Sequence, residues 1–419
     1  MKKLIATFVI VLCVGASSAV FSQELKLSIS GEVKTGIFWY AEDVAGQERT
    51  PASDGAFVHN SDENDWFDIL QSPDPYSNLK DKQQGRFRVN FNIEKGSLGA
   101  KFRFETTSWA SGASLANWGY AFLYGNFFNE QFRVSAGKLG DSPWGTGDPY
   151  LSEKELDTTM GIRFEYMPLF APGLNVGFVL NDWNTTAPST AEFTDLLAET
   201  VLGLSYTHDY FHLRFAYRLD SEADTTDTIA YKEDQGDMLV YRLEERIIQQ
   251  YLPGFQIWAN GYFEEIGNKQ KNLLRGKNRL YVQYDPDNFT ARLRLGYNTI
   301  HMLQLSNNIN KSRQYFSVGA DFYYKLFNDL LNVGLAFDFA KDFGAGSVVS
   351  DSYLHWYIEP QLRLNLGGGI YLAFVYRYMD DFYKLDFSNS TMNAAGRYRD
   401  YECLNTKTHQ VNLRAVFTF

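Results

Sequence analysis

Strict alternation of apolar and polar residues is the feature of this sequence that most constrains its fold. In the first clear example the apolar positions are Phe87, Val89, Phe91 and Ile93, and the residues between them are arginine or asparagine. A period of two puts successive side chains on opposite faces, which is typical of a β-strand with one apolar and one polar face. The pattern resumes directly after the tight turn at 95–97.

Segments of this kind recur along the whole chain, and eighteen of them can be placed. Their ranges are 25–41, 84–94, 98–107, 115–126, 131–139, 159–167, 174–182, 200–207, 211–219, 238–244, 255–264, 278–284, 288–298, 314–324, 330–340, 353–364, 370–379 and 406–419. The segment 238–244 also fits a helical spacing through Leu239, Leu243 and Ile247, but a strand there keeps both neighbouring strands antiparallel. Sixteen strands is the alternative count, and an even number is usual for bacterial barrels.

The connections between these segments alternate in length. The short ones are 95–97, 128–130, 208–210, 285–287, 326–329 and 366–369. The long and polar ones are 42–83, 140–158, 183–199, 220–237, 265–277, 299–313, 341–352 and 380–405. Long extracellular loops and short periplasmic turns are typical of an all-β transmembrane antiparallel barrel, which is the fold class we expect.

Hydropathy excludes a helical membrane protein. Mean hydropathy is −0.31, and no run of about 18 apolar residues follows position 20. At the N-terminus, Lys2 and Lys3 precede an apolar stretch and then small residues, which is the layout of a secretory signal peptide. We therefore expect a signal peptide at 1–22, a single barrel domain at 23–419, and a location in the bacterial outer membrane.

Basic side chains are concentrated on the polar rows of the strands, where acids are fewer. The candidate basic wall consists of Arg86, Arg88, Lys101, Arg103, Arg133, Arg163, Arg292 and Arg294. Unpaired ions buried without water would each cost several kcal/mol. Eighteen strands close to a diameter that leaves an aqueous lumen. The sequence therefore predicts a water-filled interior lined by excess positive charge.

The net charge of −11 places the remaining acids in the loops and argues against nucleic acid as a partner. The six histidines form no recognisable Ser/His/Asp arrangement or metal spacing, so we expect no enzyme, no metal site and no cofactor. After removal of the signal peptide only Cys403 remains, which excludes an intrachain disulfide.

The last strand ends in an apolar row that includes Phe417 and the terminal Phe419. This ending resembles the signal that outer-membrane proteins present to the barrel-assembly machinery. That machinery and outer-membrane lipid are the partners that the resemblance implies.

The connection at 140–158 follows the fifth strand and is rich in Gly, Pro and acids. Its position and composition resemble the third loop of general bacterial porins, which folds inward and narrows the pore opposite wall arginines. The resemblance implies a constriction made by Asp141, Asp148, Glu153, Glu155 and Asp157. It also implies passive diffusion of small hydrophilic solutes and a homotrimer as a candidate assembly. General porins have sixteen strands, so an ordinary surface loop is the open alternative.

Aromatic residues fall on the polar rows of the second half of the chain. They include Trp258, Tyr262, Tyr281, Tyr323 and Tyr357. Sugar porins of the maltoporin type, which have eighteen strands, stack sugar rings on lumen aromatics, so this resemblance implies a sugar-selective porin as an alternative. A surface adhesin or receptor barrel with binding loops is another. The excess of basic wall residues favours a passive channel with weak anion preference.

Overall fold

The computed structural model describes residues 24–48, 86–105, 117–140, 142–147, 160–181, 200–219, 237–266, 275–304, 309–342, 352–384 and 401–419. The expected signal peptide, residues 1–22, lies outside these ranges. The described strands are β1 (Lys26–Glu48), β2 (Arg86–Lys95), β3 (Leu98–Glu105), β4 (Asn117–Phe127), β5 (Phe132–Lys138), β6 (Met160–Tyr166), β7 (Leu174–Asn181), β8 (Val201–Thr207), β9 (Phe211–Arg218), β10 (Asp237–Glu245), β11 (Phe255–Ile266), β12 (Arg275–Tyr284), β13 (Phe289–Gln304), β14 (Ile309–Leu326), β15 (Leu331–Asp342), β16 (Ser352–Gly367), β17 (Ile370–Lys384) and β18 (Tyr401–Thr418). A short helix, α3 (Ile247–Tyr251), lies between β10 and β11.

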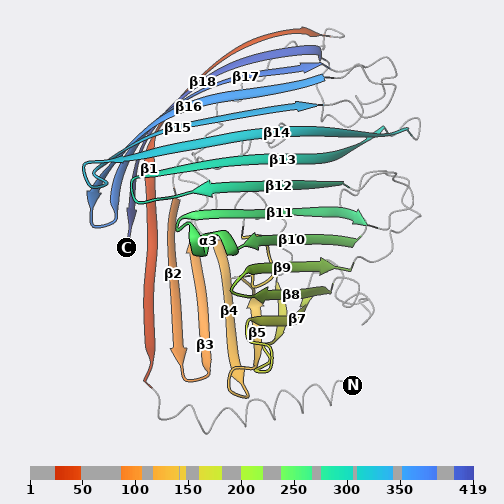
Figure 1. Ribbon diagram of the computed structural model, residues 1–419, viewed down its shortest axis with the longest axis vertical. Helices are drawn as coiled ribbons and strands as arrows, with labels where there is room; N and C mark the ends of the chain where they lie inside the picture. The colour runs from red at the N-terminus through yellow and green to blue at the C-terminus, as the bar shows by residue number, and fades with distance from the viewer. Residues whose placement is uncertain are drawn as a thin grey trace.

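These eighteen strands form one closed barrel. Each strand pairs antiparallel with the next in sequence, and β1 closes the ring by pairing with both β2 and β18. In Figure 1, β2–β4 cross the direction of β11–β14, as expected for opposite walls of a barrel with tilted strands. The expected fold class and the count of eighteen are confirmed, and the alternative count of sixteen is wrong.

The C-terminus takes part in this closure. The backbone N–H of Gly31 donates to the Phe419 carbonyl at 2.8 Å, and the Phe419 N–H donates back to the Gly31 carbonyl at 3.0 Å. Phe417 and Phe419 are partly exposed on the outer surface, and their rings stack with centroids 5.6 Å apart. The terminal aromatic pair therefore lies at the seam between the first and last strands.

Both patterns found near position 240 are present in the structure, one after the other. Residues Asp237–Glu245 form β10, with Arg242 paired to Arg214 of β9 and to Asn260 of β11. The helical spacing belongs to the turn that follows, where α3 covers Ile247–Tyr251. The predicted strand is confirmed, and the helix occupies the connection to β11.

Several strands extend beyond their predicted ends. The connection predicted at 299–313 is mostly strand, because β13 continues to Gln304 and β14 begins at Ile309. The two extensions pair with each other without a break in register, from Thr299 with Gln314 to Gln304 with Ile309. In the sequence of the β13 extension, Thr299 and His301 follow the apolar row, whereas Ile300 and Met302 follow the polar row. The alternation that marks a strand is therefore lost while the backbone pairing continues. Prediction from periodicity placed the strand ends too early here.

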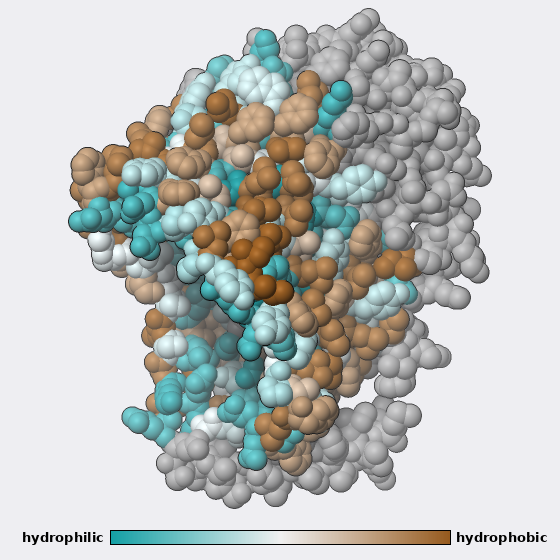
Figure 2. All heavy atoms as spheres, in the orientation of Figure 1, coloured by the Kyte–Doolittle hydropathy of each residue, from teal (hydrophilic) through white to brown (hydrophobic). Residues whose placement is uncertain are grey.

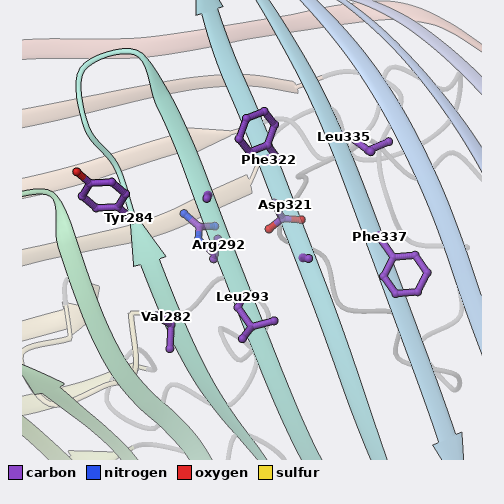
Figure 3. A pocket seen from close by; sticks show the side chains of 10 residues that line it. Val282, Tyr284, Arg292, Leu293, Asp321, Phe322, Leu335 and Phe337 are labelled. Carbon is purple, nitrogen blue, oxygen red and sulfur yellow. The ribbon is translucent and has the colours of Figure 1, made fainter.

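The two faces of the strands differ in the way that the alternation predicts. Large apolar side chains point outward and stay exposed, for example Leu123 at 62% and Phe322 at 47%, and Figure 2 shows apolar side chains over much of the visible face. A shallow outer groove across β12–β15 is lined by such residues, among them Leu293, Phe322 and Phe337 (Figure 3). An apolar exterior over a polar interior is the arrangement of a membrane barrel.

No helix in the described part of the chain is long and apolar enough to cross a membrane.

Candidate functional site: the inner wall and the segment folded against it

The basic residues of β2–β5 remain partly exposed on the inner face. The Arg88 guanidinium forms an ion pair with Glu105 at 2.8 Å. Arg103 Nε donates to Asn90 at 2.9 Å, and its guanidinium lies 4.5 Å from the centre of the Tyr120 ring. The side chain of Arg86 lies outside the described part, although its backbone is in β2. Cross-strand neighbours thus hold these cations in place without covering them.

Three further predicted wall residues in this half of the barrel differ in burial. Arg133 Nε donates to Asn126 at 2.8 Å, and the guanidinium lies 5.0 Å from the centre of the Tyr124 ring. Lys101 is also half-buried. Arg163, by contrast, is 2% exposed and forms an ion pair with Glu165 at 3.1 Å. Arg163 is therefore part of the packed interior and not of the accessible wall.

Charged residues are buried on another part of the inner wall, in β13–β17. Arg294 is 1% exposed and pairs with Asp338, and Arg377 donates to Glu359 at 2.7 Å. Gln361 also donates to Glu359. The prediction that lumen charges would all face water is wrong for this region. The carboxylates and guanidinium groups compensate one another, which removes the cost of burying either alone.

This burial determines which charges of the inner wall remain accessible to solvent. Among the described residues that are buried, four arginines stand against five carboxylates. The partly exposed inner residues are mostly basic. They include Arg88, Lys101, Arg103, Arg133, Arg214, Arg218, Arg242, Lys277, Arg292 and Lys325 against Glu32, Glu94, Glu105 and Glu244. The accessible inner wall of the described residues is therefore basic even though the buried part is close to neutral.

Residues 142–147, which we call the inner segment, fold against the inside of the barrel. Trp144 is fully buried, and its ring lies over Gly177 of β7 and Gly203 of β8. The indole Nε1 donates to Asn175 Oδ1 at 3.3 Å. The described part of loop 140–158 therefore points into the barrel, and the alternative of an ordinary surface loop is wrong for these residues.

Two guanidinium groups hold the backbone on either side of Trp144. Arg163 donates to the carbonyl of Gly140 at 3.2 Å, and Arg242 donates to the carbonyl of Thr146 at 3.0 Å. The expected constriction acids lie outside the described residues, namely Asp141, Asp148, Glu153, Glu155 and Asp157. Within the described residues, Arg163 and Arg242 therefore contact loop 140–158 through its backbone carbonyls.

The predicted lumen aromatics face inward but are mostly covered. Tyr262, Tyr281 and Tyr357 are buried, while Trp258 and Tyr323 are half-buried. Trp258 stacks on Tyr281 with ring centroids 4.8 Å apart, and the Arg377 guanidinium lies 4.3 Å from the Tyr357 ring centre. Since the rings stack on each other and on guanidinium groups, they offer few free faces to a sugar.

The inward aromatic residues of β4 were not predicted from the sequence, and they are Tyr120, Phe122 and Tyr124. Plain alternation would place Trp118 on the same face, yet Trp118 is 52% exposed. The register between β3 and β4 shifts at Gly119, so one extra residue reverses the face of everything that follows. The glycine between two aromatic residues was the available signal for this bulge.

Metal binding has no support in the described ranges, where no group of three or more His, Cys, Asp or Glu side chains could hold an ion. The described inner wall instead consists of ion pairs, hydrogen-bonded amides and aromatic rings, with partly exposed guanidinium groups. Such a surface can attract and orient charged solutes electrostatically.

A closed antiparallel barrel with an apolar exterior and a charged interior defines the class of the protein, an outer-membrane β-barrel. No family model matches the chain, and no curated protein is similar to it in sequence.

Several solved structures that resemble the chain are outer-membrane proteins. The anion-selective porin from Comamonas acidovorans is 14% identical, with 94% of this chain and 100% of that chain covered and a TM-score of 0.45. The outer membrane channel DcaP of Acinetobacter baumannii is 11% identical, with 94% and 97% covered and a TM-score of 0.45. A loop-deletion mutant of OmpT, an outer membrane protein of Vibrio cholerae, is 11% identical, with 94% and 99% covered and the same TM-score. Likeness at this level concerns the fold alone.

Proposed function

We propose that this protein is a passive outer-membrane channel for small hydrophilic solutes, with a weak preference for anions. The observation that carries the proposal is the basic character of the accessible inner wall, on which Arg88, Arg103 and Arg133 are each only half-buried. A water-filled pore lined in this way has a positive potential, which concentrates anions and partly excludes cations. The N-terminal stretch 1–22 would direct export, and the assembly machinery would insert the barrel.

The preference is proposed to be weak for two reasons. Several wall cations already pair with acids, as Arg88 does with Glu105 and Arg242 with Glu244. Dissolved salt also screens the charges that remain accessible, over about 10 Å at 0.1 M. Anion preference should therefore decrease as the salt concentration rises.

Neutralising the accessible cations should shift the selectivity toward cations. We expect a variant with Arg88, Arg103 and Arg133 all changed to Gln to move the zero-current potential, measured across a salt gradient in planar bilayers, in the cation direction. The matched control is Lys138→Gln, because Lys138 lies on the apolar row and donates to the carbonyl of Trp118 on the neighbouring strand. An equal shift in both variants, or none in either, would argue against the basic wall as the source of selectivity.

A further inference from the structure

We infer that Trp144 is the positioning residue that fixes the inner segment inside the channel, and that Gly203 lacks a side chain to make room for the ring, with Gly177 completing the seat. The inference rests on the proposed function, because the place of the inner segment matters for transport only if solutes pass through the barrel. It adds to the proposed function by identifying the residue that keeps the inner segment in place inside the channel.

The two glycines of the seat are needed for the space they leave and not for their backbone conformation. A Cβ added at Gly203 would overlap the indole ring of Trp144. One added at Gly177 would overlap the Phe164 carbonyl oxygen of β6 and would also lie 2.9 Å from Trp144 Cζ2. Neither glycine has a backbone in the left-handed region that requires glycine. A glycine inside a strand weakens the strand unless something must approach closely. At Gly203 the closely approaching group is the Trp144 ring, and at Gly177 it is the Phe164 carbonyl together with the edge of that ring.

Polar contacts set the orientation of the ring in this seat. The indole N–H donates to Asn175, whose amide donates to Glu165 at 2.8 Å. Glu165 in turn pairs with Arg163, the residue that holds the Gly140 carbonyl. The tryptophan and the start of the inner segment are therefore attached to the same chain of contacts on β6 and β7.

The inner segment is also shaped locally around Trp144. The Ser142 hydroxyl oxygen accepts from the backbone N–H groups of Trp144 at 3.3 Å and Gly145 at 2.6 Å. Beyond the ring, Arg242 of β10 holds the Thr146 carbonyl. The contacts described on both sides are hydrogen bonds to backbone carbonyls, whereas Trp144 buries a whole indole ring. Loss of the ring should therefore release the segment.

The test measures the release of the inner segment directly. Thr146→Cys, in a Cys403→Ser background, places a thiol at a position where the threonine is fully buried. A bulky, charged maleimide should label it slowly in the folded, detergent-solubilised barrel. Adding Trp144→Ala or Gly203→Val should raise the labelling rate about tenfold or more, because the rate follows the free energy of local opening. Trp144→Phe, which keeps a ring, and Leu202→Val, on the outer face of β8, should label slowly.

Single-channel conductance of the same variants connects the seat to transport. We expect Trp144→Ala and Gly203→Val to conduct more than the parent and to fluctuate between levels, while Leu202→Val matches the parent. Slow labelling of both seat variants in a barrel that remains folded would overturn the inference, as would fast labelling with unchanged conductance. Fast labelling in a protein that forms no pores in any variant would refute the proposed function and leave Trp144 as the anchor of the inner segment.

Discussion

Changing Glu359 to Ala is expected to destabilise the barrel by about 3–5 kcal/mol, because it leaves the Arg377 guanidinium buried without its carboxylate partner. Glu359 is fully buried and accepts hydrogen bonds from both Arg377 and Gln361. The free energy of unfolding, measured by urea titration of the barrel in lipid vesicles, would report the loss. Replacing the pair together, as Glu359→Leu with Arg377→Met, should restore much of the stability, since no buried charge is then left alone.

The control for this prediction lies on the same strand. Arg363 of β16 is exposed, donates to Asn365 at 2.8 Å and lies 3.8 Å from the centre of the Tyr371 ring. Because exposed contacts of this kind contribute little, Arg363→Ala should change stability far less than Glu359→Ala. Equal losses in the two single variants would mean that the buried network of β13–β17 does not exist as described.

Changing Phe102 to Arg is the second substitution with a large expected effect. Phe102 is on the outward row of β3, near the middle of the strand, and its ring lies 6.2 Å from that of Trp118 on β4. An arginine facing lipid at the bilayer midplane costs roughly 2–4 kcal/mol. Arg103→Ala, one residue away on the inner face, should leave folding nearly unchanged. Comparable urea midpoints for the two variants in vesicles would show that the faces are assigned wrongly.

The sequence predicted the barrel because lipid imposes a simple rule on every strand. Outward positions that face lipid favour apolar residues, so alternation marks all eighteen strands, including 238–244 where a helical spacing competed. The prediction of strand ends and faces failed where this rule does not apply. β13 and β14 continue as paired strands past the point where polar and apolar residues keep to separate rows. At Gly119 a single extra residue reverses the faces of β4.

The interior was predictable only in its residue types. Alternation placed Arg163, Arg294 and Arg377 on the inward row, but it carries no information on how far an inward side chain is covered by others. Their burial depends on partners distant in sequence, such as Asp338 for Arg294, forty-four positions away. The seat of Trp144 was hidden for the same reason, since it combines a loop residue with two glycines of separate strands.

The most direct test of a basic, water-filled channel is the current through the purified protein in planar bilayers, with the zero-current potential read across a salt gradient. We expect discrete conductance steps and a zero-current potential whose sign indicates mild anion preference. This preference should diminish as salt screens the charges of the wall. Absence of ion-conducting steps from correctly folded protein, or a clear preference for cations, would contradict it.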